Sequence, residues 1–519
     1  MKNFGNGPVW ALGGLLCCGF LGANHTGVYT WHNDIRRTGQ NLLEKKLKPG
    51  QLNSTHFGKL FSVPVDGALY AQPLYVAGVD IPGQGRHNVV YAATENDSVY
   101  AFDADHAGEA LWHASFTDGK TVTAVSSEDV QCRDLRPRIG ITGTPVIDPA
   151  SGILYVVAKT KERLGSVETF VQRLHALDIR TGREKLGGPV TIEVKGSSPF
   201  NALRENQRPA LLLSHGIVYI GFASYCDQEP YHGWLLGYEA STLRQVMAYN
   251  ATPKGTDGGI WQSGGGPAAD AKGDLFFITG NGTFDAHTGG PNYGDSFIRL
   301  STAGIVADYF TPHDQEALSQ ADLDLGSAGQ ILLPDQAGPH PHEMISSGKN
   351  SAIYLVDRDH MGHFQAESDS QIVQAIPDAF SSEGFTGGVF TAPVLWKDLI
   401  YFGAVGCPIE TFRLQNGLLT KTPVMQSSST YAFPGAAMSV SADGDHQGIL
   451  WALEISTGSA RPAILHAYDA ADLTKELYRS DQAGSRDELD VGVKFTSPTI
   501  VDGKVYVAGQ SRLTVLGFR

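Results

Sequence analysis

The chain has 519 residues, 42% hydrophobic and 18% charged, a balance that allows a large core and argues against disorder. The net charge is −15 with no basic cluster, which argues against nucleic acid as a partner because phosphate binding requires concentrated Lys and Arg. The 61 glycines and 26 prolines predict many turns between short strands rather than long helices.

Residues 1–23 are predicted to be a secretory signal peptide. Lys2 precedes a short apolar stretch from Val9 to Gly22, and the Leu-Gly-Ala ending at Ala23 is a cleavage site. The stretch is too short for a membrane span, so we expect no transmembrane segment and a secreted or periplasmic protein. The alternatives are an ordinary buried segment and a lipid attached to Cys17.

Residues 24–49 are predicted to be a lead-in segment that packs on the rest of the chain, anchored by Tyr29 and Trp31. From residue 50 to 519 we expect one domain built from repeats. A step of small residues, usually with Pro, precedes an apolar strand, a turn and further strands. The pattern occurs eight times, in copies that begin AQPLYVAG, GTPVIDPA, RPALLLSH, GGPAADAK, GQILLPDQ, TAPVLWKD, SVSADGDH and TSPTIVDG.

Each copy alternates apolar and polar residues over five to eight positions and then breaks at Gly or Asp, which is typical of strands joined by tight turns. The repeat therefore predicts an all-β fold, an eight-bladed β-propeller of antiparallel sheets. The last copy has no outer strand, and residues 56–65 have the form of that strand. We expect the ring to close by pairing the two ends of the chain. A seven-bladed ring with one extra hairpin is the alternative.

Of the five cysteines, Cys17 and Cys18 fall in the signal region. Cys132, Cys226 and Cys407 then permit one disulfide and one free thiol, in a pairing that the sequence leaves open. No Cys-x-x-Cys-His motif is present, which excludes covalent c-type haem, and no Cys and His set has zinc spacing.

Polar residues with possible chemistry gather in the fourth and fifth copies. Asp322 and Asp324 lie two apart, on one face of an extended segment, and they repel unless a cation or a reaction uses them. Asn281 lies in an Asn-Gly pair, a common hairpin turn, and Lys349 alone is typical of surface charge. Individually these residues favour turns and a solvated face; only their order along the chain favours a site.

The phrase ALDIRTG resembles the repeat of quinoproteins, propellers that bind pyrroloquinoline quinone (PQQ). From residue 206 to 364 the landmarks resemble those of PQQ-dependent alcohol dehydrogenases. The stretch ITGNGTFD resembles their calcium-binding Asn, here Asn281, and TPHDQEALSQADLDLG resembles the turn before their catalytic Asp, here Asp322. SSGKNSAIYLVDR resembles the strand whose basic residue contacts the quinone, here Lys349. The separations of 41 and 27 residues fit the family's layout.

The resemblance implies PQQ and Ca²⁺, or a lanthanide, as cofactors. Asn281, Asp322, Asp324 and an acid from the stretch CDQE, Asp227 or Glu229, would bind the cation, since hard cations prefer six to eight oxygen ligands. Asp322 would take the proton of an alcohol or sugar while hydride passes to the quinone, and Lys349 would stabilise the developing negative charge. Electrons would then leave to an electron acceptor.

Three features depart from the family. Adjacent cysteines occur only at Cys17–Cys18, so the expected vicinal disulfide is missing. Pro267, Ala268 and Ala269 replace the tryptophan on which the quinone lies, leaving Trp261 as the substitute. The tryptophans that join neighbouring blades are few.

Two further functions compete with the dehydrogenase. One is a non-catalytic propeller, a scaffold or a carbohydrate- or protein-binding module. The other is hydrolase or lyase chemistry on a polysaccharide, which would use His340 and His342 with the carboxylates; a polar loop is the simpler interpretation of those histidines. A site requires Asn281, Asp322, Asp324 and Lys349 to meet at one end of the channel.

Overall fold

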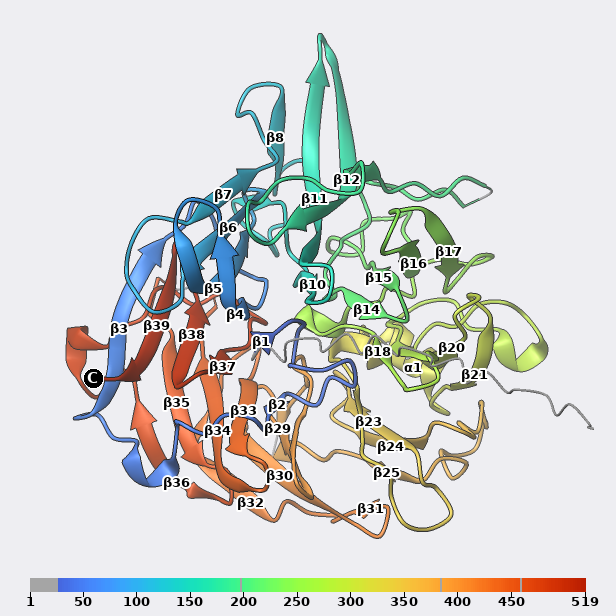
Figure 1. Ribbon diagram of the computed structural model, residues 1–519. Helices are drawn as coiled ribbons and strands as arrows, with labels where there is room; N and C mark the ends of the chain where they lie inside the picture. The colour runs from blue at the N-terminus through green and yellow to red at the C-terminus, as the bar shows by residue number, and fades with distance from the viewer. Residues whose placement is uncertain (1–26, 197, 383–384, 458–459) are drawn as a thin grey trace, which may run out of the picture.

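The computed structural model describes residues 27–519 except 197, 383–384 and 458–459. The predicted signal peptide lies outside these residues. Eight sheets of four or more strands surround a common centre, and each predicted copy supplies most of one such sheet (Figure 1). The all-β propeller fold is confirmed.

The first four sheets follow one another along the chain. They contain β1 (Gly27–Val28), β4 (Leu74–Ile81), β5 (Gly85–Thr94), β6 (Ser98–Asp103) and β7 (Trp112–Ser115); β8 (Val122–Ser126), β9 (Arg138–Ile139), β10 (Val146–Asp148), β11 (Ile153–Leu164), β12 (Val167–Asp178) and β13 (Val190–Thr191); β14 (Leu212–Ser214), β15 (Ile217–Gly221), β16 (Trp234–Glu239) and β17 (Gln245–Asn250); and β18 (Ala268–Ala269), β19 (Leu275–Ile278), β20 (Phe297–Leu300) and β21 (Val306–Phe310).

The last four sheets include the two that take strands from the N-terminal region. They contain β22 (Ile331–Leu332), β23 (Glu343–Ser347), β24 (Ile353–Asp357) and β25 (Gln374–Ile376); β28 (Val394–Trp396), β29 (Leu399–Phe402), β30 (Pro408–Gln415), β31 (Leu418–Leu419) and β32 (Met425–Thr430); β2 (Gln40–Asn41), β33 (Ala437–Asp443), β34 (His446–Glu454), β35 (Ile464–Asp469) and β36 (Asp472–Arg479); and β3 (Phe57–Pro64), β37 (Thr499–Val501), β38 (Lys504–Ala508) and β39 (Arg512–Phe518).

The remaining elements are short. They are a small hairpin of β26 (Ser381–Ser382) and β27 (Phe385–Thr386), the helix α1 (Gln315–Gln320) and the 3-10 turns η1 (Pro49–Gln51), η2 (Gln262–Gly264), η3 (Ala286–Thr288), η4 (Leu325–Ser327) and η5 (Gly484–Arg486). Within the described part of the chain, no helix is long and apolar enough to cross a membrane.

The ring closes as the sequence predicts. β3 pairs antiparallel with β39 and becomes the outermost strand of the last sheet. Phe57 on β3 is fully buried, and its ring packs against Trp451, Tyr478 and Phe518. The N-terminal strand therefore joins the last two sheets through an aromatic contact as well as through backbone hydrogen bonds.

The lead-in segment lies inside the ring (Figure 1). β1 pairs with the innermost strand β4, and β2 pairs parallel with β33. Between them, backbone carbonyls of the lead-in segment accept hydrogen bonds from residues of four more inner strands: Ile147 to Tyr29, Ala269 to Ile35, Leu332 to Arg36 and Leu395 to Thr38. The Arg37 side chain reaches Leu211 O (3.1 Å), next to β14, and Asn41 Nδ2 donates to Ile500 O of β37 (2.9 Å). The segment thus contacts the inner edges of all eight large sheets.

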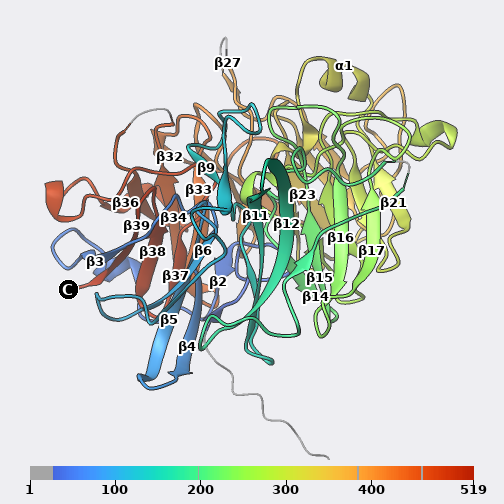
Figure 2. The ribbon, with the colours of Figure 1, turned by 90° about the horizontal axis from the view of Figure 1, so that it is seen from above.

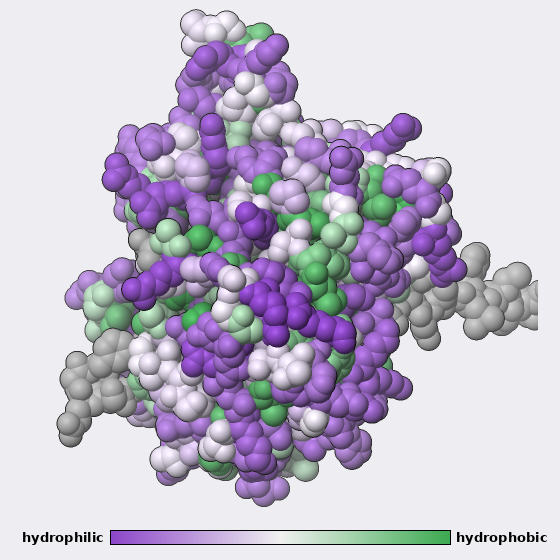
Figure 3. Space-filling model, turned by 90° about the vertical axis from the view of Figure 1, so that its left-hand side faces the viewer, coloured by the Kyte–Doolittle hydropathy of each residue, from purple (hydrophilic) through white to green (hydrophobic). Residues whose placement is uncertain are grey.

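The face shown in Figure 3 is mostly hydrophilic, as expected for a chain of net charge −15. The hairpin of β11 and β12 projects well beyond its sheet (Figures 1 and 3). Its tip carries the exposed Leu164 and Val167. Apart from this tip, large exposed apolar residues are scattered.

Candidate active site

The direction of the strands decides which loops can meet. Apart from β2, which pairs parallel with β33, neighbouring strands in each sheet run antiparallel. The loop between the second and third strands and the connection from the outermost strand to the next sheet therefore leave on the same face. Asn281 follows β19 and Lys349 follows β23, both second strands, and Asp322 and Asp324 lie between β21 and β22. All four therefore emerge on one face, on the side where α1 lies in Figure 2.

The structure brings these four residues into direct contact. Lys349 Nζ lies 2.7 Å from Asp322 Oδ1 and 2.7 Å from Asp324 Oδ2. Asn281 donates from Nδ2 to Asp322 Oδ1 (3.0 Å) and from its backbone N–H to Asp324 Oδ1 (2.9 Å). The ammonium group and the amide offset the repulsion between the two carboxylates, so Asp322 and Asp324 can lie close together.

The two carboxylates differ in exposure. The Asp322 side chain is 73% exposed and that of Asp324 is 8% exposed. Burial raises the pKa of Asp324, although the Lys349 charge and the Asn281 N–H oppose the shift. Burial works against a charged Lys349, but Asp324 and Asp322 outweigh it and raise the pKa of this ammonium. Asp322 is therefore the carboxylate that an entering molecule can reach.

A third carboxyl group, Asp295, lies behind Asp324 and was not predicted from the sequence. Its side chain is buried and accepts hydrogen bonds from the Leu325 N–H (3.1 Å) and Gln315 Nε2 (3.3 Å). Burial, together with the neighbouring Asp324, raises the pKa of Asp295 well above its usual value. Burial and the neighbouring Asp324 therefore both disfavour a further negative charge on Asp295.

The backbone at the site is unusual. Asp322 has φ of 55°, and Asp227, Cys226 and Asp295 have φ of 50°, 50° and 43°. Such left-handed conformations are uncommon outside glycine, although Asp tolerates them, and they gather where the surrounding structure fixes a functional geometry.

A cavity of about 230 Å³ adjoins this cluster, and we call it the site cavity. Four of the predicted residues line it: Asp227, Trp261, Asp324 and Lys349. The sequence did not predict its other main lining residues, Asp134, Arg208, Phe390, Phe433, Lys494 and Phe495. Arg208 lies over two rings of this cavity, 4.5 Å from the Phe495 centroid and 5.8 Å from that of Trp261.

Trp261 and Asp324 approach each other across Gly280. A Cβ atom on Gly280 would lie 2.7 Å from Trp261 Cδ1 and 2.2 Å from Asp324 Oδ1, so only glycine fits. Trp261 Nε1 is buried and has no hydrogen-bond partner among the described residues. The tryptophan therefore forms an apolar wall beside the carboxylates and keeps one donor unused.

The missed lining residues share a position in the repeat. The third copy begins at Arg208, and the sixth and eighth copies begin directly after Phe390 and Phe495. At each of these positions the chain passes from one sheet to the next. These crossings lead to the inner strands at the channel. The position in the repeat, rather than the residue type, was the signal that could have found them.

Cys132 and Cys226 form a disulfide, and Cys407 is a buried free thiol, as the cysteine count allows. The adjacent cysteines Cys17 and Cys18 lie outside the described residues, and the described part of the chain holds no vicinal disulfide. Cys226 lines the site cavity next to Asp227. The disulfide links the loop between β8 and β9 to the loop after β15.

Asp227 shares the cavity but not the cluster. Its Oδ1 accepts hydrogen bonds from Tyr231 Oη (2.9 Å) and Ser224 Oγ (3.2 Å). No hydrogen bond or ion pair joins it to Asn281, Asp322 or Asp324 in the described structure. Its assignment as a cation ligand stays a prediction.

One observation tests whether Asn281, Asp322 and Asp324 could bind a hard cation such as Ca²⁺. Asn281 Oδ1 is buried without a hydrogen-bond partner among the described residues, beside two carboxylates. An amide oxygen with adjacent carboxylates is the chemistry that Ca²⁺ or a lanthanide ion prefers. Lys349 now balances those carboxylates, and the described residues contain no group of three or more His, Cys, Asp or Glu placed to hold a metal ion. The three residues fit part of a coordination shell.

His340 and His342 do not belong to this site. They lie between β22 and β23, a first-to-second strand connection that leaves on the opposite face. His340 Nδ1 lies 2.7 Å from Asp357 Oδ2, and His342 Nδ1 lies 2.6 Å from Asp359 Oδ2. Both are loop residues held by local carboxylates, which removes the residues on which the hydrolase or lyase hypothesis rested.

No family model and no curated protein matches the sequence. Among solved structures, the chain is similar to BamB from Moraxella catarrhalis, with 13% identity, a TM-score of 0.48 and coverage of 89% of this chain and 98% of that one. It is also similar to a europium-containing methanol dehydrogenase, with 14% identity, a TM-score of 0.49 and coverage of 93% and 81%.

Proposed function

We propose that this protein is an exported quinoprotein-type dehydrogenase that oxidises an alcohol or a sugar. The observation that carries the proposal is the mutual bonding of Asn281, Asp322, Asp324 and Lys349 beside a cavity walled by Trp261. Three loops from two sheets have no structural need to converge on one exposed carboxylate at the channel mouth.

Asp322 is the base in this proposal. Its Oδ1 accepts the bonds from Asn281 and Lys349, and its exposed Oδ2 accepts the proton of a substrate hydroxyl. Lys349 holds the carboxylate in place from 2.7 Å and balances charge that develops near it. When bound, PQQ supplies the acceptor for the two electrons and the cation polarises it. Asn281 Oδ1 and Asp324 would hold that cation, and Trp261 would lie against the ring of the quinone.

Export is part of the proposal. The disulfide between Cys132 and Cys226 fits an oxidising compartment, in agreement with the predicted signal peptide of residues 1–23. The electrons would leave to a separate electron acceptor of that compartment.

The second candidate is a non-catalytic propeller that binds a protein or carbohydrate. Lys349 pairs with both Asp322 and Asp324, so the fold holds these two carboxylates together without a metal ion. The projecting β11–β12 hairpin, with Leu164 and Val167 exposed at its tip, offers a contact for a protein partner.

Substitution of Asp322 separates these functions. Protein loaded with PQQ and Ca²⁺, or with PQQ and a lanthanide, should reduce an artificial dye with an alcohol or sugar, and Asp322→Asn should lower kcat by about 10²–10⁴-fold because the proton acceptor is lost. The exposed side chain predicts an unchanged melting temperature. Asp472→Asn, an exposed carboxylate paired only with local groups, is the control. Folded protein that neither binds PQQ nor reduces dye favours the binding module.

A further inference from the structure

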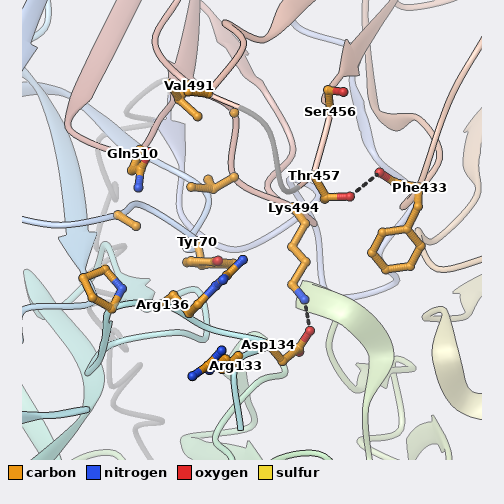
Figure 4. Close-up of a pocket in the computed structure, with 15 residues that line it drawn as sticks. Tyr70, Arg133, Asp134, Arg136, Phe433, Ser456, Thr457, Val491, Lys494 and Gln510 are labelled. Carbon is orange, nitrogen blue, oxygen red and sulfur yellow. Dashed lines mark hydrogen bonds and ion pairs between the residues drawn. The ribbon is translucent and has the colours of Figure 1, made fainter. Parts of the chain in front are cut away.

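A second cavity of about 570 Å³ adjoins the site cavity and shares Asp134, Phe433 and Lys494 with it. We call it the arginine cavity because Arg133 and Arg136 line it (Figure 4). It lies over the loop between β8 and β9 and over the connections that lead into β4 and β37. A molecule in one cavity can therefore extend into the other past Lys494.

The lining carries more positive than negative charge. Three cations, Arg133, Arg136 and Lys494, face one carboxylate, Asp134. Asp134 is already shared, because it pairs with Lys494 and with Arg208 Nη1 at 3.0 Å. Neither Arg133 nor Arg136 forms an ion pair with a described residue. Two guanidinium groups without an ion-pair partner among the described residues therefore stand at a cavity in a protein of net charge −15.

The state of Lys494 agrees with this excess. Its side chain is 9% exposed, and burial, followed by repulsion from Arg208, lowers the pKa of the Lys494 ammonium to about 8. Asp134 raises that pKa without compensating fully. A further anion beside Lys494 would relieve the repulsion among these cations.

The rest of the lining suits a small organic anion. Tyr70, Thr457 and Gln510 offer hydroxyl and amide groups, and Val491 and Phe433 offer apolar surface. Guanidinium groups bind carboxylates and other oxoanions through paired N–H donors. Cations on one wall and mixed polar and apolar groups on the others match a ligand with an anionic end and a carbon body.

We propose that the arginine cavity binds the anionic group of a small organic ligand, a carboxylate or another oxoanion, through Arg133, Arg136 and Lys494. The ligand's uncharged part then points past Lys494 toward the site cavity. On the proposed function, the substrate is an acidic alcohol, such as a hydroxy acid or a sugar acid, rather than a neutral alcohol. The assignment as substrate rests on that function; anion binding does not.

The Cys132–Cys226 disulfide supports this cavity mechanically. Arg133 directly follows Cys132, and Asp134 and Arg136 lie on the same crossing. Cys132 and Leu135 are buried in a small cluster with Val130 and Tyr225. The cationic side chains therefore project from a segment that is fixed on its inner side.

Binding is tested by calorimetry on the full protein without PQQ or added cation, with D-glucuronate, sulfate and neutral D-glucose as probes. We expect D-glucuronate to bind, sulfate to compete with it, and D-glucose not to bind. Arg136→Gln and Arg133→Gln should each weaken D-glucuronate about tenfold or more, the equivalent of one lost charge-assisted pair. Arg244→Gln, an exposed arginine on the β16–β17 turn, is the control for the same loss of charge.

Equal affinity for D-glucose and D-glucuronate, or equal weakening by Arg244→Gln, overturns the proposal. PQQ is itself a carboxylate, so PQQ alone is the last probe. Binding of PQQ that is lost in Arg133→Gln and Arg136→Gln would assign the cavity to the cofactor and also overturn the proposal. The calorimetry uses neither PQQ nor dye reduction, so its result can be interpreted even if the protein has no dehydrogenase activity.

Discussion

The Lys349–Asp324 pair is the most consequential contact at the scale of single residues. Asp324 is nearly fully buried, and its two oxygens accept from Lys349 Nζ and the Asn281 N–H. A buried carboxylate that loses its only counter-charge is costly to keep ionised. The stability of the site region should therefore depend on pH through Asp324.

Lys349→Met should destabilise the protein by about 3 kcal/mol at pH 8 because Asp324 is left charged and unpaired. The pKa of Asp324 is already raised above its usual value, so the folded state holds the proton more tightly than the unfolded state and stability falls as pH rises through that pKa. The substitution raises the pKa further. The loss should consequently be smaller at pH 5 than at pH 8, because a larger fraction of the Asp324 carboxyl groups is protonated at the lower pH.

Urea unfolding at pH 5 and pH 8 measures this difference. Lys120→Met, at an exposed position, is the matched control and should be neutral at both pH values. An equal loss for Lys349→Met at the two pH values would show that packing, rather than the charge on Asp324, carries the effect.

Which residues form the site was predictable only where they share a motif. Asn281, Asp322, Asp324 and Lys349 follow one another in a recognisable order, and the structure brings them together. Arg208, Asp134 and Lys494 belong to three separate crossings, and nothing local to any of them signals an ion pair with the others. These three residues meet only because the closed ring brings distant connections together around one channel.

At the scale of strands and loops, the repeat was readable because each copy is local. Alternation, Gly and Asp turns and the small-residue step recur within tens of residues, and the outer strand at residues 57–64 retained that form even though it is far from its partner. The disulfide was not readable, because its cysteines are 94 residues apart and three cysteines allow three pairings.

The disulfide should stabilise the crossing that carries Arg133 and Arg136. Closing a loop of 94 residues reduces the entropy of the unfolded chain by an amount worth up to about 4 kcal/mol. We expect Cys132→Ala combined with Cys226→Ala to lower the free energy of unfolding by roughly this amount and to weaken D-glucuronate binding. Denaturant unfolding and calorimetry measure the two effects.

Reduction of the Cys132–Cys226 disulfide provides the control for this prediction. Dithiothreitol should destabilise the wild type and leave the double variant unchanged, since Cys407 remains a buried thiol in both. If thiol titration shows that the disulfide has been reduced, yet the free energy of unfolding of the wild type is unchanged, the disulfide does not stabilise the protein.

At the scale of the whole molecule, the lead-in segment ties the ring together from inside. Arg37 is fully buried and donates to Pro267 O (2.9 Å), Leu211 O (3.1 Å), Trp31 O (3.1 Å) and Thr30 Oγ1 (2.7 Å). These acceptors belong to the segment itself and to the crossings or inner strands of the third and fourth sheets. One side chain therefore satisfies buried groups that have no access to water.

Arg37→Met should lower the free energy of unfolding by at least about 3 kcal/mol, since several buried carbonyls lose their donor at once. Differential scanning calorimetry should also show a broader transition, because the sheets would be less tightly coupled. Arg36→Met, at the exposed neighbouring position, is the control and should keep both the melting temperature and the width. A sharp, unshifted transition in Arg37→Met would show that the segment only fills space.

The pairing of the two ends also sets an order of events in time. The lead-in segment and β3 are made before the strands that complete their pairing, since Asn41 meets Ile500, 459 residues later, and β3 meets β39. β1 can pair with β4 early, but β3 lacks its partner until the last sheet has been made. A newly made molecule therefore keeps unpaired strand edges until β39 is available to close the ring.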